Sequence, residues 1–234
     1  EIALSLINDF GPYEKILGYG HSTGATILTN YVIENGDDAF DAFMFNGPFF
    51  DFDESAVNEF LLETIGSFLP STSFLPGTEV ESPDEFENNP LQYLNRDIVL
   101  AAYQLRFRSV YYTEWSVDSR YFLAVTAGFT QAARALFQKL RTYDGITQKP
   151  TVVLLSQQDN IINIQEAIEA SSHFNSDRAV VELSYNFHDV FYAYFEEDAS
   201  IAKQAARSFL EQFFSNCFRL LERSLLLQIF QYIS

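Results

Sequence analysis

The stretch that decides the fold is EKILGYGHSTGATILTNYV, residues 14–32. A short β-like run over residues 15–19 changes at once into residues that favour a helix, with Ser22 at the corner. Gly20 and Gly24 stand two residues before and two residues after this serine. The residue at the apex of a strained strand-to-helix turn crowds its neighbours, so those neighbours must lack bulk. The stretch therefore predicts a tight turn that presents the hydroxyl of Ser22.

The composition is that of a folded, acidic protein. Of 234 residues, 47% are hydrophobic, which suffices for the core of one domain, or of one domain with a large insertion. A net charge of −18 argues against nucleic acid, which needs a basic surface, and against docking on an anionic membrane. No apolar run is long enough to span a membrane. We expect a soluble protein, cytoplasmic rather than secreted.

Metal and cofactor chemistry find little support in the sequence. The three histidines are widely spread, and no Cys or His pair has the spacing of metal ligands. A single cysteine, Cys217, allows no disulfide within the chain. We therefore expect no metal and no cofactor.

Strands and helices are expected to alternate along most of the chain. Helices of ten or more residues between strands imply parallel pairing and an α/β fold. The continuous apolar run over 152–155 fits a strand that is buried on both faces. The expected strands cover residues 15–19, 41–50, 151–157 and 179–185, and the expected helices residues 23–34, 164–173 and 197–214.

The middle of the chain has a different texture. Acidic loops and helical periodicity fill residues 51–145, so this segment is expected to be a mainly helical insertion over the carboxyl ends of the strands. The core would then consist of residues 1–50 and 146–214. Residues 215–234 form a tail with apolar residues at helical spacing. That tail either packs on the body or contacts a membrane or a partner.

Three residues could carry nucleophilic chemistry. A serine hydroxyl needs a base to remove its proton, and a carboxylate to orient that base. Asp159 lies just beyond the strand over 151–157, and His188 lies just beyond the strand over 179–185. The order Ser22, Asp159, His188 is the order that a serine hydrolase with a strand-to-helix elbow requires.

Each choice has competitors. Asp51 and Asp53 follow the strand over 41–50, so either could replace the preferred acid. His173 is expected in or at the end of a helix, and His21 lies in the elbow itself, where its ring cannot turn onto the adjacent hydroxyl. Asp189 is expected to be a solvated carboxylate that points away from the site.

The segments GHSTGA, PTVVLLSQQDNII and NFHDVFYAYFEED together resemble the serine α/β-hydrolases of the lysophospholipase, monoacylglycerol lipase and serine aminopeptidase group. The resemblance covers residues 1 to about 214, and FENNPLQYLNRD and YYTEWSVDS are similar to its helical cap. It implies that Ser22 is the nucleophile, His188 the general base and then acid, and Asp159 the residue that orients His188. The backbone N–H of Thr23 would be one oxyanion donor.

This sequence departs from the family that it resembles in two ways. The family has further strands before the nucleophile strand, with a loop that supplies the second oxyanion donor, so we expect a partial chain that folds poorly or turns over weakly. The tail after residue 214 extends beyond the family's last helix.

The expected substrate is a lipid-like carboxylic ester, cleaved through an acyl-enzyme intermediate. The predicted cap is rich in aromatic residues that would suit an acyl chain, although a cap that buries them in its own core explains them equally well. Peptide or amide cleavage, and ligand binding without turnover, remain open as alternatives. The aromatic residues proposed to line the substrate site are Tyr111, Tyr112 and Trp115.

Overall fold

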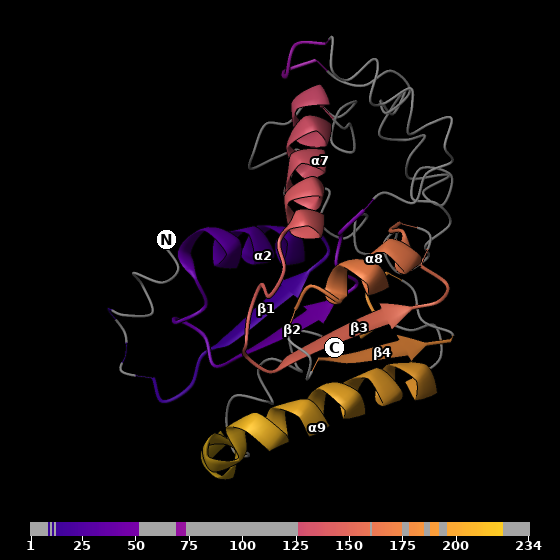
Figure 1. The fold of residues 1–234 in the computed structure, drawn as a ribbon. Helices are drawn as coiled ribbons and strands as arrows, with labels where there is room; N and C mark the ends of the chain where they lie inside the picture. The colour runs from indigo at the N-terminus through magenta and orange to yellow at the C-terminus, as the bar shows by residue number, and fades with distance from the viewer. Residues whose placement is uncertain are drawn as a thin grey trace, which may run out of the picture.

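The computed structural model describes most of the two expected core segments and parts of the sequence between them (Figure 1). The described residues are 9, 11, 13–51, 69–73, 126–159, 161–174, 178–184, 188–191 and 196–221, and for 196–198 and 214–221 they are described by backbone alone. Tyr111, Tyr112 and Trp115 lie outside these ranges, as do residues 52–68 and 74–125 of the expected cap and residues 222–234 of the tail.

The core is a parallel sheet of four strands in the order β1-β2-β3-β4. Every neighbouring pair is parallel, and the register aligns His21 with Asn46 and Asn46 with Leu154. Consecutive parallel strands need crossover helices, which the chain supplies between β1 and β2 and between β3 and β4. The strands are β1 (Leu17–His21), β2 (Ala42–Asn46), β3 (Thr151–Ser156) and β4 (Ala179–Leu183).

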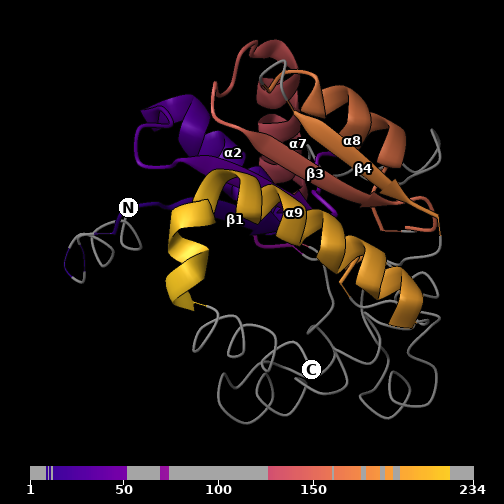
Figure 2. The ribbon, with the colours of Figure 1, turned by 90° about the horizontal axis from the view of Figure 1, so that it is seen from below.

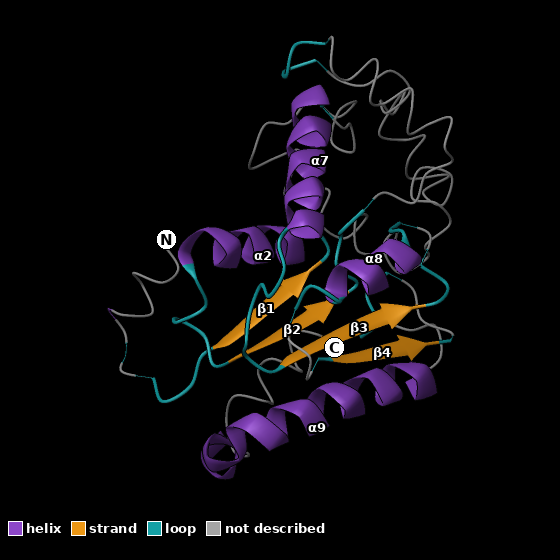
Figure 3. Ribbon diagram, in the orientation of Figure 1, coloured by secondary structure: helices purple, strands orange, loops and turns teal. Residues whose placement is uncertain are grey.

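Helices cover both faces of the sheet, as the view from below makes clear (Figure 2). Helices α2, α7 and α8 lie on one side, and the long helix α9 runs across the other (Figures 1 and 3). This three-layer arrangement is the α/β architecture expected from the alternation of elements. The helices are α2 (Thr23–Asn35), α7 (Ala127–Thr142), α8 (Ile164–Ser171) and α9 (Glu196–Leu221).

Alternating side chains of the strands build two separate apolar cores. Phe43 and Phe45 of β2 pack with α2, α7 and α8, whereas Ala42 and Met44 pack with α9. Side chains alternate between the two faces of a strand, so one strand contributes to both cores. The five residues of β2 are all buried, which explains why the first four of them are apolar without interruption.

The first strand begins two residues later than its sequence suggests. The backbone N–H of Ile16 donates to the Asp41 carboxylate at 2.8 Å, and Lys15 forms an ion pair with the same group at 2.9 Å. The Asp41 side chain therefore holds both Lys15 and Ile16 just before the strand pair β1–β2 begins. Pairing with β2 starts at Leu17 and continues to His21.

Both ends of the segment 51–141 are bonded to helix α8. Arg141 at the end of α7 forms ion pairs with Asp51 at 2.5 Å and with Glu166 of α8 at 2.9 Å. The backbone carbonyl of Asp51 also accepts from the N–H of Asn163, the N-cap of α8. Helix α7 in addition contributes Phe137 to the core beside α2.

Helix α9 is longer than expected. Its 26 residues run through position 214, where the sequence suggested that the last core helix ends. Its buried residues on the sheet are Ala199, Ala202, Ala206 and Phe209, which recur three to four residues apart. None of the described helices is long and apolar enough to cross a membrane.

Candidate active site

Ser22 occupies the turn between β1 and α2 with an unusual backbone. Its φ of 52° and ψ of −127° lie outside the regions that non-glycine residues ordinarily adopt. Ser22 stands at the N-cap position, yet its side chain makes no capping hydrogen bond to the helix. A capping serine would use its hydroxyl there, so the hydroxyl of Ser22 is directed elsewhere.

Gly20 and Gly24 differ in how much space the turn leaves for a side chain. A Cβ at Gly20 would lie 2.6 Å from the Cα of Ala25, because α2 returns directly over the end of β1. A Cβ at Gly24 would meet no atom of the described chain within 4 Å. Within the described residues, an added Cβ would therefore collide at Gly20 and would meet open space at Gly24.

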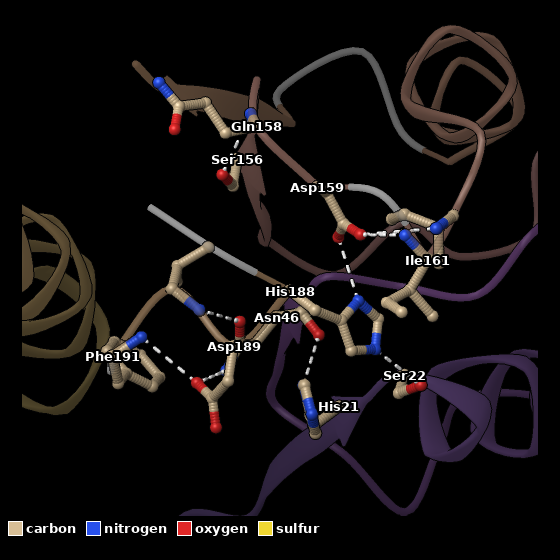
Figure 4. Close-up of polar contacts among 12 residues, drawn as sticks. His21, Ser22, Asn46, Ser156, Gln158, Asp159, Ile161, His188, Asp189 and Phe191 are labelled. Atoms are coloured by element: carbon tan, nitrogen blue, oxygen red, sulfur yellow. Dashed lines mark hydrogen bonds and ion pairs between the residues drawn. The ribbon is translucent and has the colours of Figure 1, made fainter. Parts of the chain in front are cut away.

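The hydroxyl of Ser22 faces His188, and His188 faces Asp159 (Figure 4). The Ser22 Oγ lies 2.8 Å from His188 Nε2, and His188 Nδ1 lies 2.8 Å from Asp159 Oδ2. A carboxylate accepts hydrogen bonds, which places the ring proton on Nδ1 and leaves Nε2 to accept from the hydroxyl. The three side chains come from turns after β1, β3 and β4.

Burial and hydrogen bonds hold the carboxylate of Asp159 in place. Asp159 is 5% exposed and His188 2% exposed. The second carboxylate oxygen of Asp159 accepts from the backbone N–H groups of Ile161 and Ile162, at 2.8 and 3.2 Å. One oxygen is thus fixed by the turn that leads into α8, and the other is left for the imidazole.

The competing acids and histidines have other partners. Asp51 forms its ion pair with Arg141, and His173 pairs with Asp144 at 3.0 Å. Asp53 lies outside the described residues. Asp189 is not simply a solvated carboxylate, because its Oδ1 accepts from the Asn46 side chain at 2.7 Å and from the Phe191 N–H at 3.1 Å. The expectation for Asp189 is therefore wrong.

His21 packs beside the general-base candidate. The centroids of the His21 and His188 rings lie 5.1 Å apart, and His21 Nδ1 donates to the backbone carbonyl of Asn46 at 2.9 Å. Burial lowers the pKa of His21, and the charge of Asp189 only partly offsets that effect. His21 therefore stays neutral at the edge of the site.

Asn46 is a site residue that no pattern in the sequence singles out. It is the last residue of β2, it is fully buried, and its side chain contacts Asp189 and Val190. An asparagine before Gly47-Pro48 has the sequence pattern of an ordinary turn. Asp189 and Val190 lie more than 140 residues further along the chain, so no local signal predicts these contacts.

Thr23 begins α2 directly after the serine. The first N–H groups of a helix have no acceptor one turn back within that helix, and they face negative charge favourably. The role of the Thr23 N–H as an oxyanion donor stays a prediction. Within the described ranges, no three His, Cys, Asp or Glu side chains gather as metal ligands would.

Parallel strands whose carboxyl ends carry a serine elbow, an acid and a histidine in that order define the α/β-hydrolase class. A family model described as "Serine aminopeptidase, S33" matches residues 3–194. The chain belongs to this family of α/β-hydrolases. A search of curated protein sequences gives no match.

Solved structures support the same fold. The monoacylglycerol lipase of Paleococcus ferrophilus aligns with a TM-score of 0.60 and 14% identity, over 90% of this chain and 73% of that one. A soluble variant of the monoglyceride lipase of Saccharomyces cerevisiae aligns with a TM-score of 0.61 and 12% identity, over 91% and 68% of the two chains. The α/β-hydrolase fold expected from the sequence is confirmed.

Proposed function

We propose that this protein is a serine hydrolase that cleaves carboxylic esters through an acyl-enzyme intermediate. The observation that carries the proposal is the unbroken chain of two 2.8 Å contacts from Ser22 through His188 to Asp159. Nucleophile and base within this distance, with the base oriented by a third group, is the arrangement that activates a serine.

In the proposed acylation step, Ser22 Oγ attacks the ester carbonyl carbon while His188 Nε2 takes the hydroxyl proton. The carbonyl π electrons move to oxygen, and the resulting oxyanion accepts from the N–H of Thr23. Collapse of this intermediate breaks the bond to the alcohol, which leaves with the proton from His188. The Asp159 carboxylate stabilises the imidazolium that forms in between.

Deacylation repeats these roles with water. His188 takes a proton from a water molecule, whose oxygen attacks the acyl carbon. The proton then passes from His188 to Ser22 Oγ, and the carboxylic acid leaves. Both half-reactions balance without a metal, a cofactor or a redox partner.

We propose a lipid-like ester as the substrate class. Phe49 lies beside the elbow, because its N–H donates to the backbone carbonyl of Ser22 at 3.1 Å. Its ring is stacked on Phe129 of α7, which remains 40% exposed. This apolar surface close to Ser22 suits an acyl chain. A monoacylglycerol lipase and a monoglyceride lipase share this fold, which agrees with that choice.

Peptide cleavage is the second candidate, because the matching family is described as a serine aminopeptidase. The same three side chains can open an amide bond, so substrate comparison must decide between them. A monoacylglycerol, a short p-nitrophenyl ester and an aminoacyl p-nitroanilide should be hydrolysed with decreasing kcat/KM in that order. A preference for the anilide would favour the aminopeptidase.

An active-site fluorophosphonate probe tests the mechanism. We expect labelling of the wild type, no labelling of Ser22→Ala, and labelling at least about a hundredfold slower for His188→Ala. Ser172→Ala, at the exposed end of α8, is the matched serine control and should be labelled like the wild type. Labelling of Ser22→Ala at the wild-type rate would contradict the assigned nucleophile. An unlabelled wild type would favour a binding protein without turnover.

A further inference from the structure

The side chain of Asn46 is buried between the two halves of the candidate site. Its Oδ1 accepts from the backbone N–H of Val190 at 3.1 Å. Its Nδ2 donates to Asp189 Oδ1 at 2.7 Å and to the Tyr19 hydroxyl at 3.2 Å. The residue is 0% exposed, so these protein partners replace water for the whole amide.

Only one orientation of this amide satisfies its surroundings. A backbone N–H can only donate, and an ionised carboxylate can only accept. If the amide of Asn46 were flipped, its NH₂ would face the N–H of Val190 and its oxygen would face Asp189. The contacts therefore assign both the position and the direction of the Asn46 side chain.

The partners of Asn46 belong to the segment that carries His188. Asp189 and Val190 follow the histidine directly, and Asp189 Oδ1 also accepts from the Phe191 N–H at 3.1 Å. A Cβ at Gly47 would collide with the backbone carbonyl oxygen of His188. The end of β2 is thus in direct contact with the histidine segment, and Asn46 fixes that segment by its hydrogen bonds (Figure 4).

The backbone of Asn46 holds the other half of the site. Its carbonyl oxygen accepts from the N–H of Ser22 at 3.1 Å and from His21 Nδ1 at 2.9 Å. One residue therefore contacts the serine turn through its main chain and the histidine segment through its side chain.

We propose that Asn46 is a positioning residue that sets the distance and angle between His188 Nε2 and Ser22 Oγ. The proposal rests on the proposed function, because it assigns Asn46 a part in the same reaction. Proton transfer needs the reacting atoms within hydrogen-bonding reach, and a misplacement of about 1 Å can cost about a hundredfold in rate. Asn46 touches no reacting atom, so its effect passes through His188.

The test separates the rate of reaction from the fraction of molecules that react. The fluorophosphonate probe gives both, as the second-order rate constant of labelling and as the end-point stoichiometry. For Asn46→Ala we expect the rate constant to fall about ten- to hundredfold, while the stoichiometry of the folded protein stays at the wild-type value. Met44→Ala is the matched control, since Met44 lies in the same strand, is 3% exposed and packs on α9. It should lose stability with its labelling rate per site unchanged.

A second pair of variants changes Asp189, the acceptor of the Asn46 hydrogen bond, and replaces Asn46→Ala if that variant does not fold. Asp189→Asn keeps an oxygen that can accept from Asn46 and from Phe191, whereas Asp189→Leu removes it. We expect the labelling rate of Asp189→Leu to be at least about tenfold below that of Asp189→Asn. Equal rates for the two variants would overturn the proposal.

The outcomes distinguish this proposal from the proposed function. A labelled wild type with an unchanged rate constant in folded Asn46→Ala would overturn the positioning role alone. A loss of stoichiometry without a loss of rate would also overturn it, because that is the result of a purely structural residue. A wild type that is never labelled would overturn the proposed function and the positioning role together. As a further readout, the downfield imidazole proton of His188 should shift in Asn46→Ala and keep its position in Met44→Ala.

Discussion

Single residues set the geometry of the elbow through steric contact. Ser22 adopts a positive φ, and the residue two places before it touches the helix that follows. Such backbone conformations cost of order 1–3 kcal/mol and persist only where the surroundings enforce them. In this chain the enforcing contacts are the bond from Ser22 N–H to Asn46 and the close approach of Gly20 to Ala25.

Gly20→Ala should therefore destabilise the fold and distort the site. The added methyl would lie 2.6 Å from the Cα of Ala25, which is backbone and cannot move aside cheaply. We expect a loss of about 1–3 kcal/mol in the free energy of unfolding, measured by urea denaturation. Gly24→Ala is the control, where we expect a change of at most about 1 kcal/mol, in the stabilising direction. Similar losses in both variants would show that the described packing does not govern the turn.

His21 should make stability depend on pH. Its pKa is lowered in the folded chain, so below about pH 6.5 the unfolded chain binds a proton that the folded chain refuses. The contribution of His21 is complete above about pH 6.5, the unfolded pKa, and is lost progressively as the pH falls from there through the lowered pKa of the folded chain. Urea midpoints at about pH 7.5 and about pH 5.5 should differ more for the wild type than for His21→Asn, whose amide can still donate to the Asn46 carbonyl. An equal pH response in both proteins would contradict this assignment.

At the level of elements, the sequence predicts most strands and helices closely, because each has its own period and its own boundary signal. The strand at 151–156 follows Pro150 and contains the apolar run 152–155, and α2 ends beside Asn35-Gly36. Element boundaries that depend on distant side chains cannot be predicted from such local signals. The start of β1 depends on Asp41, 25 residues from Ile16, and the contacts of Asn46 depend on a loop near the other end of the chain.

Helix α7 should be held mainly by its buried face. Phe137 is 1% exposed and packs at the edge of Phe49, with ring centroids 5.1 Å apart. We expect Phe137→Ala to cost about 3–5 kcal/mol, because it leaves a cavity beside α2 and β2. Gln138→Ala, the next residue and an exposed one, should change stability by less than about 0.5 kcal/mol. Thermal denaturation of both variants measures the difference, and a similar loss for the two would contradict it.

For the whole molecule, the parallel sheet brings distant segments to one edge. The carboxyl ends of neighbouring parallel strands meet there, which is why the order of Ser22, Asp159 and His188 could be predicted from sequence. Their mutual contacts at 2.8 Å could not be predicted, since they depend on how each turn leaves its strand. Their catalytic roles, and the limits of the four expected segments, stay predictions.

Net charge is the other property of the whole molecule with a measurable consequence. With 14 basic and 32 acidic residues, the folded chain repels itself over its surface. Raising ionic strength from about 0.02 M to about 0.3 M shortens the screening length severalfold, so the melting temperature should rise and then level off. Sodium chloride and potassium chloride should act alike, because the effect depends on ionic strength. A melting temperature that falls over this range would contradict dominant self-repulsion.

The anchoring of Asp51, Arg141 and Glu166 has an evolutionary consequence. Because these ion pairs and the Asn163 bond join both ends of a long stretch to α8, the ends meet whatever lies between them. Doubling the length of a closed loop costs only about 0.6 kcal/mol, so the stretch can be exchanged or resized at little expense to the sheet. The length of that stretch can therefore change in evolution while the hydroxyl, imidazole and carboxylate stay where they are.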